Sequence, residues 1–145
     1  MKHPFLPGFL FLALSQIAAA ESTLSEIREG LWELIFKSEI TPTPTKQTTS
    51  ATNISQQCLT RETSADPHTF LQNIDCEILN LNQHATQMSW DMRCQQQGIQ
   101  LTGDGKASYS HESFNGTVNV TMQGERYATL KITTQISGRY LGNCE

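Results

Sequence analysis

The stretch Met88-Ser-Trp-Asp-Met-Arg-Cys94 alternates without a break between apolar and polar side chains. A period of two places Met88, Trp90, Met92 and Cys94 on one face of an extended strand and the polar residues on the other. Antiparallel sheets tolerate one face in water, whereas the strands of buried parallel sheets are apolar on both faces. The stretch therefore predicts one strand of an antiparallel sheet with a single apolar face.

The same alternation recurs on both sides of this stretch. It predicts further strands at about residues 31–40, 48–59, 78–79, 99–109, 114–122 and 128–136. Short polar links such as His111-Glu112 and Gln123-Gly124-Glu125 have the composition of hairpin turns. We therefore expect a mainly β fold, an antiparallel up-and-down meander of about seven strands. The prolines between residues 41 and 50 are expected to end the first strand, because proline has no N–H to donate.

Two signals modify this simple sheet. Gly103 and Gly105 fall on the apolar face of one strand, where glycine marks a bend or a close approach of another backbone. They predict a curled sheet, which is either a half-barrel or a closed barrel. Residues 60–73 are expected to form a short helix between strands two and three, with Thr60 and Asp66-Pro67 as start signals and with Phe70 facing the sheet. Residues 22–29 are expected to form either a second short helix or a frayed terminus.

Four cysteines are present, at positions 58, 76, 94 and 144, and no C-x-x-C motif occurs. An even number in an exported chain favours two disulfides, for which three pairings exist. A hairpin centred on Ala85 would place Cys76 opposite Cys94, and a cross-strand pair of this kind is within disulfide reach. By elimination, Cys58 pairs with Cys144.

The first twenty residues have the pattern of a secretory signal. Lys2 and His3 provide a basic start, an apolar stretch follows from Phe5 to Leu14, and Ala18-Ala-Ala20 offers a cleavage site. We expect cleavage after Ala20, a periplasmic location, and a single disulfide-stapled domain at residues 21–145. The apolar run is shorter than the ~20 residues that span a bilayer. No later segment is long enough either, so no membrane span is expected in the mature chain.

The remaining residues argue against several classes of function. A net charge of −4 with scattered Lys and Arg gives no footprint for phosphate backbones, so no nucleic acid partner is expected. His68, His84 and His111 each lie on a predicted helix start or turn, without ligand spacing, so no metal is expected. No G-x-S-x-G motif, free cysteine or phosphate-binding loop occurs. We expect no cofactor and no catalytic residues, and therefore a non-enzymatic binding or accessory module.

An alternative is a carrier of a small apolar ligand. Gly30-Leu-Trp32 is a G-x-W motif that resembles the opening of lipocalin-type barrels, in which the Trp packs against a late-strand Arg, here Arg139. Trp32 then joins a soft apolar face formed by methionines and a second tryptophan. The side chains expected to face a ligand in such a calycin-like carrier are Trp32, Met88, Trp90 and Met122.

The order of several short motifs resembles one family, the proteobacterial exported proteins of domain of unknown function thirty-six seventeen. The likeness covers residues 30–144, and its residues are Gly30-Leu31-Trp32-Glu33, Gln57-Cys58-Leu59-Thr60, Ala65-Asp66-Pro67, Cys76, Ser89-Trp90-x-Met92-x-Cys94, Thr102-Gly103-x-Gly105, Ser113-Phe114-x-Gly116, Met122-Gln123-Gly124 and Ser137-Gly138-Arg139-x-Leu141-Gly142-x-Cys144. One departure is Arg61, where the family often has Pro after the Thr. The resemblance implies a periplasmic address and the four-cysteine framework, and it supplies no catalytic residues.

Overall fold

The computed structural model describes residues 27–71, 74–123 and 128–145. In these residues seven strands form one antiparallel sheet, and two short helical turns lie between the second and third strands. The strands are β1 (Gly30–Thr43), β2 (Thr49–Leu59), β3 (Asp75–His84), β4 (Gln87–Gln96), β5 (Ile99–Tyr109), β6 (Ser113–Gln123) and β7 (Thr129–Gly142). The predicted fold class is confirmed.

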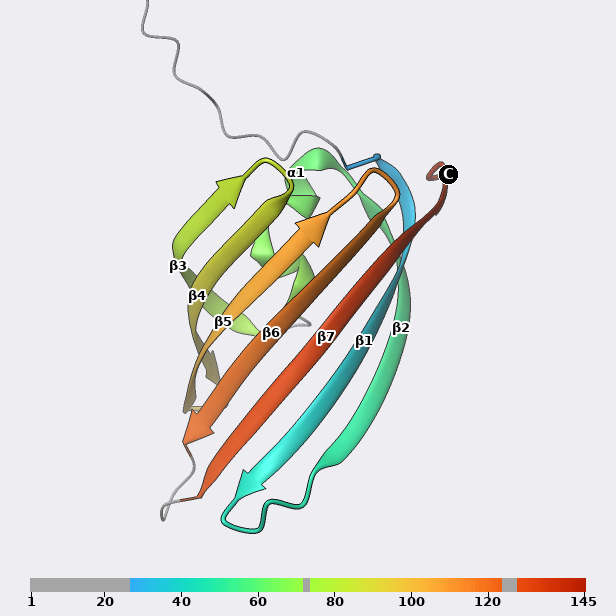
Figure 1. The fold of residues 1–145 in the computed structure, drawn as a ribbon. Helices are drawn as coiled ribbons and strands as arrows, with labels where there is room; N and C mark the ends of the chain where they lie inside the picture. Colours follow the sequence, from blue (N-terminus) through green and yellow to red (C-terminus); the bar gives the residue numbers. More distant parts are fainter. Residues whose placement is uncertain (1–26, 72–73, 124–127) are drawn as a thin grey trace, which may run out of the picture.

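The sheet order is β2-β1-β7-β6-β5-β4-β3. Strands β3 to β7 follow one another as a meander, and β7 then pairs with β1 from Thr129 opposite Thr43 to Gly142 opposite Leu31. As a result β2 and β3, which are consecutive in the chain, form the two opposite edges (Figure 1). The sheet is curled and open, so the half-barrel is observed and the closed barrel is not.

One face of the sheet, which we call the inner face, carries the core. The alternation predicted for the strands decides which side chains it holds, and the pattern for β4 runs from buried Met88 to buried Cys94 at every second residue. The buried side chains that the strands contribute are Trp32, Leu34, Phe36, Leu59, Cys76, Met88, Trp90, Met92, Cys94, Leu101, Ala107, Tyr109, Phe114, Val118, Val120 and Ile136. The opposite, outer face is polar and largely exposed.

The first strand is longer than expected. It continues through Pro42 to Thr43, and both residues are paired with β7. On its other side the pairing with β2 ends at Ile40 opposite Thr49. Beyond Ile40, β1 therefore has one neighbour only, and the missing N–H of a proline is tolerated at such an edge position.

The link from β2 to β3 must cross the inner face, because these strands lie at opposite edges. Residues 60–71, which we call the crossing segment, contain the helix α1 (Arg61–Ser64) and the 3-10 helix η1 (Pro67–Phe70). Thr60 caps α1 by accepting from the N–H of Thr63, and Asp66 caps η1 with Pro67 at its first position. Both predicted start signals are used, but they begin two separate short turns rather than one helix. Figure 1 shows these turns behind the upper half of the sheet.

Polar contacts fix the crossing segment to the strands beneath it. The hydroxyl of Tyr109 donates to the carbonyl oxygen of Ser64 at 2.7 Å, and the side-chain amide of Gln83 donates to the carbonyl oxygen of Ala65 at 2.7 Å. Burial raises the pKa of Tyr109 far above its ordinary value, so this hydroxyl stays a donor. Backbone groups that would otherwise be buried without partners are therefore satisfied by β5 and β3.

Aromatic rings fill the space under the crossing segment. Phe114 lies at the centre, with ring centroids 5.8 Å from Trp32, 5.3 Å from Phe70 and 5.6 Å from Tyr109. Its ring also covers Gly138, the residue directly opposite it on β7, where an added Cβ would collide with the ring. Glycine at this position thus makes room for the ring.

The glycines predicted to curl the sheet have the same explanation. Trp90 on β4 lies over Gly105, its direct partner on β5, and a Cβ there would collide with the indole. At Gly103 an added Cβ would meet the backbone of Asn119 on β6. The close approach predicted from the sequence is confirmed, and at Gly105 a ring, rather than another backbone, is what approaches.

Both predicted disulfides are formed. Cys76 and Cys94 are direct cross-strand partners in the β3–β4 hairpin, with Cα atoms 4.0 Å apart. Cys58 at the end of β2 is bonded to Cys144 beyond the end of β7, with Cα atoms 5.9 Å apart. On the chain-entropy argument the two bridges contribute about 3 and 4–5 kcal/mol, because the second closes the longer loop.

Several predictions fall on residues that the structure does not describe. The secretory signal at residues 1–20, cleavage after Ala20, most of the helix or frayed terminus expected at residues 22–29, and the turn at residues 123–125 beyond Gln123 all lie outside the described ranges. They stay predictions.

The contact between Phe114 and Gly138 leads to the first testable prediction. Alanine is normally favoured over glycine in a strand by ~0.5–1 kcal/mol, but here G138A should lower the free energy of unfolding by about 1–3 kcal/mol, because its Cβ overpacks the ring. In an F114L background most of this cost should disappear. Urea denaturation of the four proteins in the double-mutant cycle measures the coupling, and equal costs in both backgrounds would contradict the contact.

The disulfides differ in exposure, which leads to a second prediction. Cys76 and Cys94 are 7% and 1% exposed, whereas Cys58 and Cys144 are both exposed. Mild reduction of the folded protein should therefore open the Cys58–Cys144 bridge first, since a reducing thiolate needs access to the sulfur. Thiol alkylation followed by peptide mapping should label Cys58 and Cys144 before the other pair, and the reverse order would show that the hairpin bridge is the more accessible one.

Candidate functional site

The side chains predicted to face a ligand lie among the core residues. Trp32, Met88 and Trp90 are 0%, 2% and 3% exposed, and Met122 is partly buried against the same core. Among the described residues the indole N–H of Trp90 has no hydrogen-bond partner, and that of Trp32 donates to the carbonyl oxygen of Arg28 at 2.8 Å. That these four residues contact a ligand stays a prediction, and the inner-face cavity described below is lined by other residues.

The expected stacking of Arg139 on Trp32 is wrong. Trp32 points to the inner face and is opposite Tyr140, whereas Arg139 is opposite Glu33 and lies with it on the outer face. There the Arg139 guanidinium donates to the Glu33 carboxylate at 2.7 Å, which raises the pKa of Arg139. Adjacent strand residues face opposite sides, so a residue paired beside Trp32 cannot reach its ring. The cation near this end of the core is Arg28, which stacks on Tyr140 at 4.3 Å.

An apolar cavity of about 110 Å³ lies on the inner face, at the end of the crossing segment. Phe70, Leu71 and Ile74 form its wall on the side of the crossing segment, and strand residues form the rest. Gln96 and Thr134 are the polar residues at this cavity. The strand side chains that line it are Phe36, Leu101, Val118, Val120 and Ile132.

Beyond this cavity the inner face is no longer covered by the crossing segment. Its side chains there are still apolar, as the alternation requires, but they are only partly buried, and Ile99 is 40% exposed. The register aligns them in neighbouring rows, with Ile40 opposite Ile132 and Pro42 opposite Leu130. We call this set the open strip, and it consists of Ile40, Pro42, Ile99, Met122, Leu130 and Ile132. The cavity and the open strip together form one apolar surface that shares Ile132.

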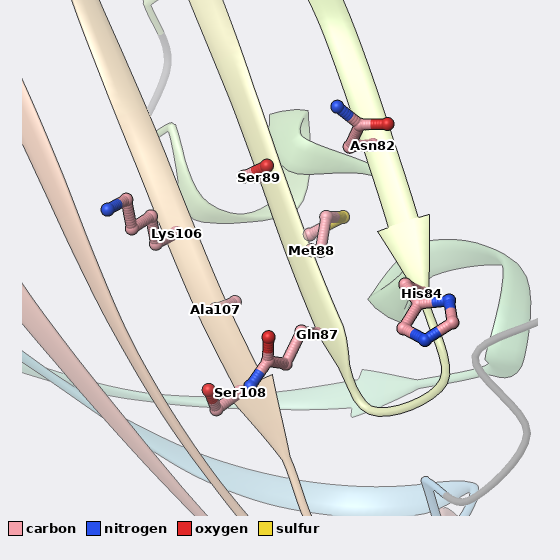
Figure 2. Close-up of a pocket in the computed structure, with 8 residues that line it drawn as sticks. All are labelled: Asn82, His84, Gln87, Met88, Ser89, Lys106, Ala107 and Ser108. Carbon is pink, nitrogen blue, oxygen red and sulfur yellow. The ribbon is translucent and has the colours of Figure 1, made fainter.

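A second hollow, of about 380 Å³, has a different character (Figure 2). It lies over β3, β4 and β5, where the outer-face residues Ser89 and Lys106 are direct partners, as are Asn82 and Ser89. Met88 and Ala107 also line it. Most of the polar side chains around it are exposed, and Lys106 is the lysine among its lining residues. A wide, solvated hollow of this kind lacks the convergent buried polar groups of a specific site.

The remaining polar cluster joins η1 to the β3–β4 hairpin. One ring nitrogen of His68 is 2.7 Å from the Asp66 carboxylate and the other is 2.8 Å from the carbonyl oxygen of Cys76. The Cys76 hydrogen bond, then that of Asp66, raises the pKa of His68 against the effect of burial. Burial acts to raise the pKa of Asp66, but the hydrogen bonds from His68 outweigh it and lower that pKa.

An Asp–His pair resembles a catalytic dyad, but the contacts here indicate a structural clasp. A general base needs a ring nitrogen with a free lone pair near its substrate. Both ring nitrogens of His68 face acceptors, so the protonated imidazolium fits this site and neither nitrogen is available to accept a proton from a substrate. The pair holds the crossing segment against the end of β3.

The other two histidines singled out in the sequence, and the strand carboxylate of Asp91, are separate from one another. Asp91 accepts from the side-chain amide of Asn80 at 2.9 Å, His84 lies at the exposed end of β3, and the carbonyl oxygen of His111 accepts from the N–H of Arg28. Among the residues that the structure describes, no group of three His, Cys, Asp or Glu side chains is arranged to hold a metal ion. No helix in the described ranges is long and apolar enough to cross a membrane.

The clasp gives a prediction about pH. The pKa of His68 is higher in the folded protein than the usual 6.5, so its stabilising contribution is complete below about pH 6.5 and is lost as the pH rises through the folded-state pKa. In H68Q the free energy of unfolding should therefore fall less between about pH 6 and pH 9 than in the wild type. Urea denaturation at several pH values measures this slope. As a control, H84Q removes an exposed histidine and should keep the wild-type slope, and an unchanged slope in H68Q would exclude the clasp.

Comparison with known proteins identifies the family. No curated protein and no solved structure matches the chain. One family matches residues 27–144, which is nearly the full length of the described domain and includes all four cysteines. The resemblance found in the sequence is thereby confirmed: the chain belongs to the family described as "Protein of unknown function (DUF3617)".

Proposed function

We propose that the protein is a non-enzymatic binding module of the periplasm, and that the apolar half of its inner face takes up an apolar group of its ligand. The observation that carries this proposal is the apolar cavity beside the open strip. Exposed apolar surface that is contiguous is uncommon on monomeric domains, and it is often a site of interaction.

The size of the cavity limits what enters it. Pockets that enclose a whole small molecule have volumes of ~300–1,000 Å³, whereas an apolar cavity of ~150 Å³ is enough for benzene. A cavity of about 110 Å³ therefore fits one short alkyl or branched aliphatic group, with the rest of the ligand lying along the open strip. Two polar side chains, Gln96 and Thr134, lie at the cavity, and Thr134 also shares a hydrogen bond with Ser38 at 2.8 Å.

Two features support export. The disulfides indicate a compartment that is more oxidising than the cytoplasm, because the cytoplasm keeps thiols reduced. The pattern of residues 1–20 supports a secretory signal, and a periplasmic location is the simplest reading of both.

A non-enzymatic role is supported by the partners of the ionisable groups. Asp66 and His68 hold the crossing segment, Tyr109 holds Ser64, and Arg139 holds Glu33. The shifted pKa values therefore have structural causes, and none of these groups lines the apolar cavity.

The calycin-like carrier foreseen as the alternative shares the apolar chemistry but differs in enclosure. A closed barrel surrounds its ligand, whereas this sheet ends at β2 and β3. In the present proposal the ligand is covered on one side only, so binding is weaker and exchange is faster than inside a barrel.

Binding of an uncharged apolar dye tests the proposal. N-phenyl-1-naphthylamine should bind saturably and gain fluorescence. The variant I132E places a carboxylate where the cavity and the open strip meet, and it should weaken binding about tenfold or more, because a charge is costly beside apolar surface. Its matched control is Q135E, which adds the same charge on the exposed outer face of the same strand and should bind like the wild type.

Native mass spectrometry of protein purified from the periplasm is the companion measurement, since a retained apolar ligand adds mass. Circular dichroism checks that I132E is folded. Equal dye affinity in I132E and Q135E, or no saturable binding by the wild type, would exclude the inner face as the binding surface.

A further inference from the structure

The two edges of the sheet differ in how they are protected. Strands at an edge expose unpaired N–H and C=O groups, and proteins block them with charges, prolines or bulges. β3 has such devices, because it carries Asp75 and Glu77 and its register with β4 shifts between Leu79 and Asn82. A bulge of this kind interrupts the row of unpaired backbone groups.

The β2 edge has none of these devices. Its eleven residues, from Thr49 to Leu59, contain no charged residue and no proline. Its pairing with β1 runs from Leu59 opposite Gly30 to Thr49 opposite Ile40 with no shift in register. Nearly all of these residues are exposed or partly exposed, and the strand lies at the edge of the sheet (Figure 1). β2 is therefore a long, regular and uncharged template for another strand.

We propose that this edge binds the β2 edge of a second copy of the chain, as an antiparallel pair that makes one continuous sheet. A two-fold interface places the same surface on both sides, so the strand must be compatible with itself. An uncharged strand meets this condition, because identical charges opposite each other would repel.

One residue favours a particular register. Ile54 lies on the outer face of β2 and is 60% exposed, more than the other exposed large hydrophobic residues Leu81, Ile99 and Leu141. Its partner on β1 is Ile35. If the two-fold axis passes through Ile54, the two copies of Ile54 are opposite each other, and a row of four isoleucines crosses the interface on the outer face.

The charges on the neighbouring strand agree with this register. With the axis at Ile54, Gln56 is opposite Thr52 of the second copy, and their β1 partners are Glu33 and Lys37. Moving the axis to Asn53 instead puts Gln56 opposite Ser50, and the corresponding β1 residues are then Glu33 and Glu39. These charges are ~14 Å apart across three strand spacings, beyond the ~8 Å Debye length, and Glu33 is already paired with Arg139, so their bias is weak and the burial of Ile54 decides the register.

The interface is small. A single strand pair buries less than the ~1,200–2,000 Å² of standard stable complexes, so we expect a weak dimer with a dissociation constant on the order of 10–100 μM. The surface is an edge of the sheet, no residue of β2 lines the apolar cavity, and the proposal does not depend on the proposed function.

Sedimentation velocity of the purified chain, from about 5 to about 500 μM, tests the proposal on the affinity scale expected for it. The wild type should shift from monomer towards dimer with concentration. I54K sets two like charges opposite each other at the axis and should stay monomeric. The matched control is L81K, which changes an exposed hydrophobic residue of the other edge strand and should dimerise like the wild type.

Hydrogen exchange provides a second readout that needs no substitution. Amides of β2 should gain protection as the protein concentration rises, whereas those of β3 should not. A wild type that is monomeric throughout this range, an I54K variant that dimerises normally, or protection at β3 instead of β2 would overturn the proposal.

Discussion

The pairing of β1 with β7 is the constraint on which the rest of the structure depends. It attaches the N-terminal hairpin to the last strand, so β2 and β3 become opposite edges although they follow each other in the chain. The connection between them then has to cross the inner face, and it does so with two short helical turns. The crossing segment covers the aromatic half of the face and leaves the aliphatic half open.

Covering an apolar face with a short irregular segment requires that its backbone polar groups be satisfied. Two strand groups do this, the hydroxyl of Tyr109 and the side-chain amide of Gln83. The segment is held further by the side chain of His68, which donates to the carbonyl oxygen of Cys76. This carbonyl lies beside the Cys76–Cys94 bridge, so the hairpin that receives the crossing segment is itself covalently held. The second bridge fixes the end of β2, where the crossing segment begins.

The two faces and two edges thus have different physical roles. The inner face combines a packed aromatic core with an aliphatic surface suited to an apolar group, while the outer face is polar and carries isolated ion pairs such as Glu33–Arg139. Of the edges, β3 is interrupted by a bulge and charges, and β2 is regular and uncharged. The proposed binding of a ligand and the proposed association of copies are therefore compatible, because they use different surfaces of the sheet.

The sequence by itself determined the approximate strands, the inner-facing side chains, the two start signals of the crossing segment and the disulfide partners, because these follow from local periodicity, capping chemistry and hairpin register. Only the tertiary structure decided which of the inner-facing apolar side chains are buried and which stay partly exposed. Ile40 and Ile132 have the same strand pattern as Trp32 and Trp90, yet the first two are only partly buried and the others are buried. Alternation specifies which face of the sheet a side chain occupies. Whether the crossing segment then covers that side chain depends on the pairing of β1 with β7, a contact between distant parts of the chain that no local pattern encodes.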